Sequence, residues 1–175
     1  MIADDGKTPI LMDLGSLATS PVVVTSRSLA LAIQDTAAEH STMPYRAPEL
    51  FDVKTGTIID GKVDIWSLGC TLYACLVGKS PFEARSEETG GSLSICVLSG
   101  DWRFPDEKPG GKGKPGEASK ADGAISEPVR EVVRKCLQVE PAERPDVDEL
   151  IKILEDVIAV LPEDDGAEDG NEVCP

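Results

Sequence analysis

The sequence has 175 residues, of which 41% are hydrophobic and 28% are charged, and its formal net charge is −15. This length suits one domain with a real core plus tails, and the composition argues against a fibre or a wholly disordered chain. The excess of negative charge repels phosphate backbones and anionic membrane surfaces, so we expect no nucleic-acid partner.

The cysteines and the hydropathy pattern bear on compartment and anchoring. The five cysteines form no C-x-x-C pair and fall mostly on apolar helical faces, so we expect reduced thiols and no metal site among them. No run of about 18 apolar residues occurs, so we expect no membrane segment in this chain. Together these features favour the cytoplasm as the default location.

The first part of the chain is predicted to be mostly loop. Residues 7–15 read as a short apolar strand that ends in Asp13 and a glycine able to make a sharp turn. Residues 16–41 are rich in Ser, Thr and Ala, so we expect a long hydroxyl-rich loop there. Within that loop, a strand signal lies at 22–24 and a candidate short helix at 28–39.

The clearest predicted helix spans residues 63–77. Its apolar side chains follow helical spacing and extend almost around the full circumference, which predicts a central buried helix. Gly78 is expected to end it. A loop through Pro81 and Phe82 should follow, and then a shorter apolar helix at about 92–98.

The last third of the chain combines an insertion, two helices and a tail. Residues 105–123 are rich in Pro, Gly and Lys, which predicts a disordered surface insertion. Residues 127–161 contain two amphipathic helices that need a shared core. Their predicted N-caps and capping partner are Ser126, Asp146 and Glu149. Residues 162–175 are acidic, and a solvated disordered tail is favoured over a dedicated binding tail.

Three separated motifs occur in a fixed order along the chain. Residues 13–15 read Asp-Leu-Gly, residues 42–49 read Thr-Met-Pro-Tyr-Arg-Ala-Pro-Glu, and residues 64–69 read Asp-Ile-Trp-Ser-Leu-Gly, with Arg144 beyond them. In this order they resemble the carboxy-terminal half of the eukaryotic protein serine/threonine kinase fold. The resemblance covers roughly residues 7–161, interrupted by the insertion.

The resemblance implies a fold and a branch of the family. It implies a partial protein kinase domain over residues 1–161, with the activation segment at 13–49. The expected fold class is mainly α, as the helical lobe of a family whose complete fold is α+β. Residues 11–16 further resemble the Numb-associated kinase group, in particular its myristoylated and palmitoylated serine/threonine kinase branch. The same resemblance extends to three residue pairs, Ser26-Arg27, Gln34-Asp35 and Ala37-Ala38.

Two positions of the resemblance concern the reaction. Asp13, beside Gly15, is implied to hold the Mg²⁺ that bridges the ATP phosphates, although Leu14 replaces the usual Phe and supplies a smaller packing contact. Thr42 is implied to approach the catalytic Asp of the family and to favour serine or threonine acceptors. The plainer alternatives are that Asp13 only ends a strand and that Thr42 only forms a turn.

The other matching positions are implied to be structural. Glu49 and Arg144 match the buried ion pair that joins the activation segment to the last helical unit. Asp64 matches a residue that accepts hydrogen bonds from the backbone of the catalytic loop, and Trp66 and Gly69 belong to the same motif.

The sequence lacks several parts of a kinase active site. It contains no His-Arg-Asp loop, no Gly-rich phosphate loop and no lysine strand. We therefore expect a fragment of an ATP- and Mg²⁺-dependent kinase of protein substrates, inactive without the N-lobe of its parent. The alternative is a naturally truncated, non-catalytic binding module. Composition alone offers several phosphorylation candidates and prefers none of them: Thr25, Ser26, Ser28, Thr36 and Ser41.

Overall fold

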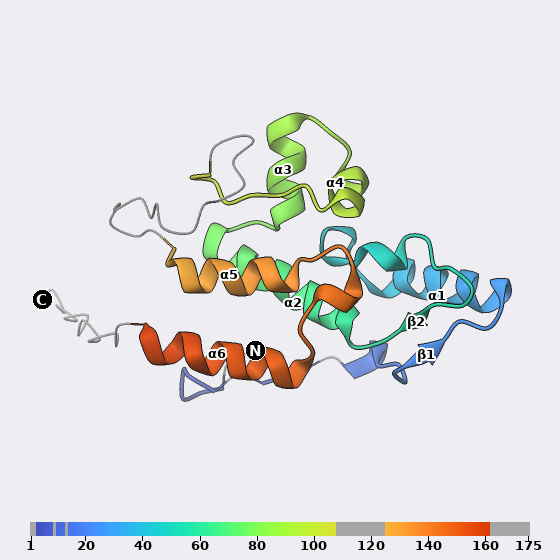
Figure 1. Ribbon diagram of the computed structural model, residues 1–175, viewed down its shortest axis with the longest axis horizontal. Helices are drawn as coiled ribbons and strands as arrows, with labels where there is room; N and C mark the ends of the chain where they lie inside the picture. Colours follow the sequence, from blue (N-terminus) through green and yellow to red (C-terminus); the bar gives the residue numbers. More distant parts are fainter. Residues whose placement is uncertain (1–2, 9, 13, 108–124, 162–175) are drawn as a thin grey trace, which may run out of the picture.

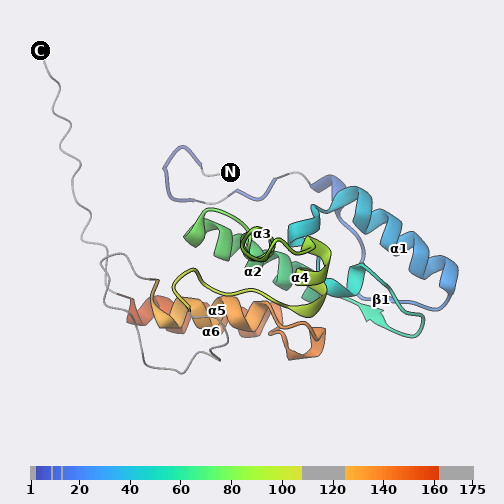
Figure 2. The same ribbon diagram turned by 90° about the horizontal axis from the view of Figure 1, so that it is seen from above.

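The computed structural model describes residues 3–8, 10–12, 14–107 and 125–161. Helix α2 (Lys62–Val77) runs through the middle, and α5 (Glu127–Cys136) packs against it (Figure 1). Helix α6 (Val147–Val160) lies beside α5, on the side away from α3 (Pro81–Thr89) and α4 (Leu93–Ser99). The remaining helix, α1 (Arg27–His40), lies at one end with the strands (Figure 2). The prediction of a mainly helical fold is confirmed.

Helix α2 is the centre of the core, as its sequence predicted. The observed helix extends the predicted range by one residue, and Gly78 ends it with a left-handed φ of 92°. Trp66, Cys70 and Tyr73 are fully buried in the largest core cluster, together with side chains from α3, α4 and α5. Other helices pack against this buried side of α2. Its opposite side, with Leu68 and Leu76, is exposed, which corrects the prediction of burial around almost the full circumference.

Helix α3 is a correction to the predicted loop through Pro81 and Phe82. Ser80 accepts a hydrogen bond from the backbone N–H of Glu83 at 3.2 Å, and the Glu83 carboxylate returns to the backbone N–H of Ser80. Pro81 occupies the first helical turn, where its missing N–H costs nothing. This capping box starts a helix that the polar sequence after Phe82 did not suggest.

Helix α1 confirms the candidate helix predicted at 28–39 and extends it by one residue at each end, so residues 16–41 contain less loop than expected. Ser26 caps it by accepting from the N–H of Leu29 at 3.2 Å. The Gln34 side chain donates to the backbone oxygen of Phe51 at 3.0 Å. Ala30 is buried in a small core cluster with Val24 and Val53. Contacts from distant residues therefore stabilise this helix.

The sheet is small and follows the strand signal at 22–24. Strand β1 (Val22–Val23) pairs antiparallel with β2 (Ile58–Ile59), with Val22 opposite Ile59. The strand predicted within 7–15 is wrong for the described residues 10–12, which carry no strand. A strand needs a neighbour for its backbone groups, and the ladder found in the described ranges joins only β1 and β2.

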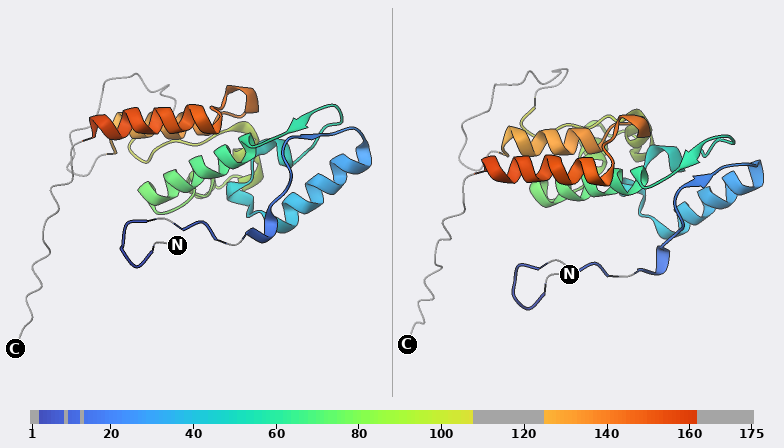
Figure 3. Two further views of the ribbon diagram at one scale, coloured as in Figure 1. Left: turned by 90° about the horizontal axis from the view of Figure 1, so that it is seen from below. Right: turned by 60° about the horizontal axis from the view of Figure 1, so that its bottom comes forward.

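The N-terminal segment instead leads into a short 3₁₀ turn, η1 (Leu14–Ser16). Apolar side chains are exposed along it, including Leu11 at 87%. In both views of Figure 3 this segment lies apart from α6, and residues 3–8 turn back on themselves, with the N–H of Ala3 donating to the backbone oxygen of Thr8 at 2.8 Å. Among the described residues, no helix is long and apolar enough to cross a membrane.

The last two helices match the predicted span of 127–161, joined by the turn η4 (Pro141–Glu143). Asp146 and Glu149 form the predicted capping box at the start of α6. Ser126 stands at the N-cap position of α5, but its side chain makes no capping hydrogen bond. The packed faces of α5 and α6 form a second core cluster that is shared with α2.

Of the predicted insertion, only the first three residues are described. Residues 105–107 form a turn, which is a correction to the predicted disorder there, because both of its carboxylates are anchored on α5. Arg130 binds Asp106 with two hydrogen bonds of 2.8 and 2.6 Å and also donates to the backbone oxygen of Ile125 at 2.9 Å. Residues 108–124 and the predicted tail, 162–175, lie outside the described residues.

Candidate functional site

The predicted partners Glu49 and Arg144 meet. Glu49 belongs to the 3₁₀ turn η3 (Pro48–Leu50), and Arg144 follows η4. The two side chains form a bidentate pair, with Nη1–Oε1 and Nη2–Oε2 distances of 2.8 Å. The Arg144 side chain is 0% exposed and that of Glu49 17%. A guanidinium and a carboxylate in this planar arrangement make a strong, charge-assisted contact.

Every N–H of the Arg144 guanidinium has a partner. Its Nε donates to the backbone oxygen of Gln138 at 2.7 Å, its Nη1 to that of Lys62 at 2.9 Å and its Nη2 to that of Val139 at 3.0 Å. With the two bonds to Glu49, these account for all five donors of the side chain. A buried charge is tolerated when its hydrogen bonds are all satisfied in this way.

Trp66 lies beneath this ion pair. The guanidinium carbon of Arg144 is 4.9 Å from the centre of the Trp66 ring, and Phe82 stacks on that ring at a centroid distance of 5.3 Å. The Nζ of Lys62 donates to the backbone oxygen of Arg144 at 2.5 Å. Trp66 therefore supports the pair from α2, which gives physical content to its predicted structural role.

Gly69 allows α2 and α5 to approach closely. A Cβ at this position would lie 2.5 Å from the Cβ of Cys136 and 3.1 Å from the Cδ2 of Leu137. Only a residue without a side chain fits at that distance. The predicted structural role of Gly69 thus corresponds to a helix–helix contact.

Thr42 lies at an exposed turn between α1 and the ion pair. It is the N-cap residue of η2 (Met43–Tyr45), which leads directly to η3 and Glu49. On α2, the hydroxyl of Ser67 donates to the backbone oxygen of Tyr45 at 2.9 Å. The ion pair of Glu49 and the hydrogen bond from Ser67 fix the path of residues 42–49. We call these residues the substrate turn, after the role that the family resemblance implies for them.

Arg46 joins the substrate turn to the end of α1. Its Nε donates to the hydroxyl of Ser41 at 2.8 Å, and its Nη2 donates to the backbone oxygen of Ser41 at 2.9 Å. The guanidinium carbon lies 5.2 Å from the centre of the Phe51 ring. Sequence reasoning placed Arg46 in the motif but assigned it no contact.

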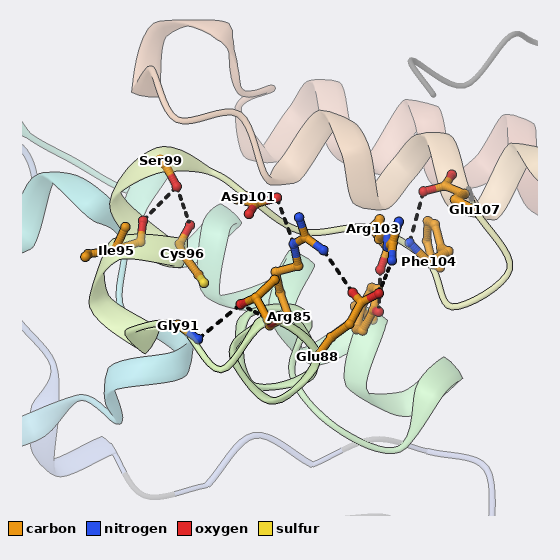
Figure 4. Close-up of polar contacts among 12 residues, drawn as sticks. Arg85, Glu88, Gly91, Ile95, Cys96, Ser99, Asp101, Arg103, Phe104 and Glu107 are labelled. Atoms are coloured by element: carbon orange, nitrogen blue, oxygen red, sulfur yellow. Dashed lines mark hydrogen bonds and ion pairs between the residues drawn. The ribbon is translucent and has the colours of Figure 1, made fainter. Parts of the chain in front are cut away.

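Ion pairs join α3 to residues 101–103, which follow directly after α4 (Figure 4). Helix α4 in turn packs against η2. Arg85 on α3 binds Asp101 at 2.9 Å and Glu88 at 2.9 Å, and Glu88 also pairs with Arg103. The Tyr73 hydroxyl donates to the backbone oxygen of Arg103 at 2.7 Å. These contacts connect α4, the helix that packs against the substrate turn, to the core.

The predicted magnesium site falls partly outside the residues that the structure describes. Asp13 lies outside the described residues, and Gly15 is exposed in η1. Asp64 is exposed in the first turn of α2. Within the part of the chain that the structure describes, no three His, Cys, Asp or Glu side chains are grouped so as to hold a metal ion. The predicted roles of Asp13, Gly15, Thr42 and Asp64 stay predictions.

Sequence reasoning missed several supports of the site. Ser67 and Lys62 touch the substrate turn and Arg144 from α2, and Phe82 stacks on Trp66. Ser67 lies inside the Asp-Ile-Trp-Ser-Leu-Gly motif, so its place next to Trp66 was a usable signal. No sequence signal pointed to Lys62 or Phe82, because their contacts depend on the folded arrangement of distant segments.

Comparisons with known proteins agree with this architecture. Residues 13–153 match the protein kinase domain family. Over 151 residues the chain is 40% identical to serine/threonine-protein kinase ppk13 of Schizosaccharomyces pombe, an alignment that covers 86% of this chain and 39% of the relative. Over 157 residues it is 32% identical to serine/threonine-protein kinase ENV7 of Saccharomyces cerevisiae, an alignment that covers 90% of this chain and 39% of that relative.

A mammalian relative gives the same result. The chain is 35% identical over 155 residues to serine/threonine-protein kinase 16 of Rattus norvegicus, covering 89% of this chain and 45% of the relative. The chain thus spans less than half the length of these three relatives. The family match, together with an ion pair that joins the motif at residues 42–49 to Arg144, shows that this chain belongs to the protein kinase domain family.

Proposed function

We propose that this chain is the substrate-receiving, helical part of a protein serine/threonine kinase that transfers a phosphoryl group from Mg-ATP. The observation that carries the proposal is the Glu49–Arg144 pair, which fixes the substrate turn against the core. Catalysis of phosphoryl transfer depends mainly on positioning and charge stabilisation, so a rigid seat for the acceptor segment is chemically useful.

Thr42 is the residue that contacts the acceptor in this proposal. It is exposed at the start of the substrate turn, while the backbone that follows it is held by Ser67 and Glu49. Its hydroxyl is the group that would select serine or threonine over tyrosine.

Asp13 and Gly15 belong to the nucleotide side of the proposed site. A carboxylate is the ligand type that Mg²⁺ prefers, so Asp13 is the residue that would hold the ion. When bound, Mg-ATP supplies the phosphoryl group and neutralises the charge that develops during transfer. Gly15 permits the backbone to turn directly after Asp13.

The branch of the family is also a proposal. We assign the chain to the Numb-associated kinase group because residues 11–16 and the pairs Ser26-Arg27, Gln34-Asp35 and Ala37-Ala38 resemble that group. The 35% identity to the kinase named serine/threonine-protein kinase 16 supports this assignment. A cytoplasmic location is part of the same proposal.

We further propose that these 175 residues do not catalyse the reaction alone. The single histidine, His40, is followed by Ser41, so the catalytic His-Arg-Asp sequence is absent from them. Apolar side chains on α2 and α6 are also exposed, among them Leu68 at 49% and Ile158 at 68%. Exposed apolar residues on two neighbouring helices favour contact with a further part of a kinase domain.

A kinase assay with two peptide libraries tests the proposal. We expect the natural full-length protein, with Mg-ATP, to phosphorylate Ser/Thr peptides but not matched Tyr-only peptides, and we expect the 175-residue chain to phosphorylate neither. Asp13→Ala should abolish turnover in the full-length protein, and the exposed control Lys54→Ala should leave it unchanged. Full activity of Asp13→Ala, or turnover by the 175-residue chain, would contradict the proposal. A natural protein that consists of these 175 residues and binds partners without transferring phosphate would establish the alternative of a naturally truncated, non-catalytic binding module.

A further inference from the structure

A pocket of about 440 Å³ lies between the segment that follows α4, the end of α5 and the turn η4. Its walls include the half-buried ring of Trp102 and the buried side chain of Leu137. Pockets that bind ligands typically measure about 300 to 1,000 Å³, so this one has room for a long side chain. None of its described lining residues belongs to the substrate turn, so a ligand here is separate from the proposed function.

The walls of the pocket are set by packing within the protein. Gly100 ends α4 with a left-handed φ of 63°, and a Cβ on it would meet the Cγ2 of Val139 at 2.5 Å. The Trp102 ring is held edge-to-face against Tyr73 and Phe104, at centroid distances of 5.7 and 5.6 Å. The pocket is therefore shaped before any ligand enters it.

The single cation among the described lining residues, Arg134, is already paired. Its Nη2 donates to Glu107 and its Nη1 to Glu127, each at 2.6 Å. The second carboxylate oxygen of Glu107 accepts from the backbone N–H of Phe104 at 3.0 Å. Arg134 and Glu107 thus satisfy each other, and neither offers an uncompensated charge to a ligand.

The side-chain groups that remain in the pocket are acceptors. Glu140 and Glu143 are exposed at its rim, and within the described part of the chain neither carboxylate has a hydrogen bond or an ion pair. The side-chain amide nitrogen of Gln138 donates to the backbone oxygen of Arg134 at 2.7 Å, which leaves the amide oxygen as a further acceptor. A matching ligand must therefore supply several donors and a positive charge.

We propose that this pocket binds an arginine side chain from a basic segment of a partner protein. A guanidinium has five N–H donors and no acceptor, and its planar fork fits carboxylates such as those of Glu140 and Glu143. Its apolar stem packs on Leu137, and the electron-rich ring of Trp102 attracts the cation. The net charge of −15 draws a basic partner toward the chain.

An NMR titration of the natural full-length protein tests the proposal. The probe signal is the indole N–H of Trp102, identified by its loss in Trp102→Phe. We expect a short, otherwise uncharged peptide carrying one arginine to shift this signal until it saturates. The same peptide with citrulline, the neutral analogue of arginine, should not shift it, and a lysine peptide should bind more weakly because an ammonium lacks the planar fork. Equal dissociation constants for the arginine and citrulline peptides would overturn the inference.

Two matched double variants separate the pocket from the general acidity of the chain. Glu140→Gln with Glu143→Gln should raise the dissociation constant of the arginine peptide by about tenfold or more, because two charged partners are lost. Glu155→Gln with Asp156→Asn removes the same charge from exposed positions of α6 and should leave the dissociation constant unchanged. An equal loss in both double variants would overturn the site.

A competition experiment checks the class of partner. Spermidine, a small cation with no planar fork, should displace the arginine peptide only at concentrations above that of the peptide itself. Displacement at lower concentrations would identify a free polyamine as the ligand and overturn the assignment to a partner protein.

Discussion

The carboxylate of Glu49 and the guanidinium of Arg144, which lie 95 residues apart in the sequence, share two hydrogen bonds of 2.8 Å inside the protein. Removal of either partner leaves a buried charge unpaired, which typically costs about 3 to 5 kcal/mol. We therefore expect Arg144→Ala to lower the melting temperature strongly, as measured by calorimetry.

The matched control for this prediction is Lys54→Ala. Lys54 pairs with Asp52, but both side chains are about two thirds exposed, with values of 67% and 68%. Exposed pairs typically contribute only about 0.2 to 1 kcal/mol. Equal effects of Arg144→Ala and Lys54→Ala would contradict the anchoring role of the Glu49–Arg144 pair.

Gly69→Ala should destabilise the contact between α2 and α5. The added methyl group would meet the Cβ of Cys136 at 2.5 Å, and overpacking of this kind typically costs about 1 to 3 kcal/mol. Gly61→Ala, at the start of the same helix, is the control, because nothing lies within 4 Å of its added Cβ. Chemical denaturation of both variants measures the difference, and a neutral Gly69→Ala would show that the helices separate easily.

The helix caps should fall into two groups. Ser80→Ala and Asp146→Ala each remove a capping box and should cost about 1 kcal/mol in denaturation experiments. Ser126→Ala should be neutral or stabilising, because the buried Ser126 hydroxyl has no hydrogen-bond partner among the described residues. A loss at Ser126 equal to that at Ser80 would indicate a partner that the structure does not show.

Asp106 should contribute to the pH dependence of stability. The hydrogen bonds from Arg130 hold the pKa of Asp106 below its ordinary value of 3.8. Its contribution is therefore present above pH 3.8 and is lost as the pH falls through the lowered value in the folded state. We expect the wild type to melt above Asp106→Asn at pH 7 and this difference to shrink below pH 4. A constant difference would exclude this linkage.

The cysteines should differ in their rate of alkylation. Burial raises the pKa of Cys136 to about 11 and also raises that of Cys70, whereas Cys75 is exposed. Since the thiolate is the reactive form, iodoacetamide should modify Cys75 first in a Cys174→Ser background. The buried thiols should react only after urea is added. Early modification of Cys70, detected by peptide mass mapping, would show that α2 is accessible in the native state.

The parts of the fold that the sequence predicted well are those with local signals. The span of α2 and the Asp146–Glu149 capping box can be identified from neighbouring residues alone, and both are confirmed. The Ser80–Glu83 box has the same spacing, but the polar residues after Phe82 concealed it. The candidate helix at 28–39 is confirmed as α1, but no local pattern reveals its contact from Gln34 to Phe51.

The site was predictable to a similar degree. The motif spacing led to the Glu49–Arg144 pair because a family resemblance supplied the pairing. The Arg46–Ser41 contact was not predictable, because it depends on how α1 ends next to the substrate turn. Contacts made across two adjacent elements therefore needed the structure.

Arg144 also constrains the order in which this protein can fold during its synthesis. The ribosome makes Glu49 first and must add 95 more residues before the partner exists, which takes roughly 5 to 20 s at typical elongation rates. During that interval the carboxylate of Glu49 stays in water and the substrate turn has no anchor. The nascent chain can therefore form this ion pair only after the described helices α1 to α5 have been translated. A chain that leaves the ribosome before Arg144 is added lacks the anchor of the substrate turn.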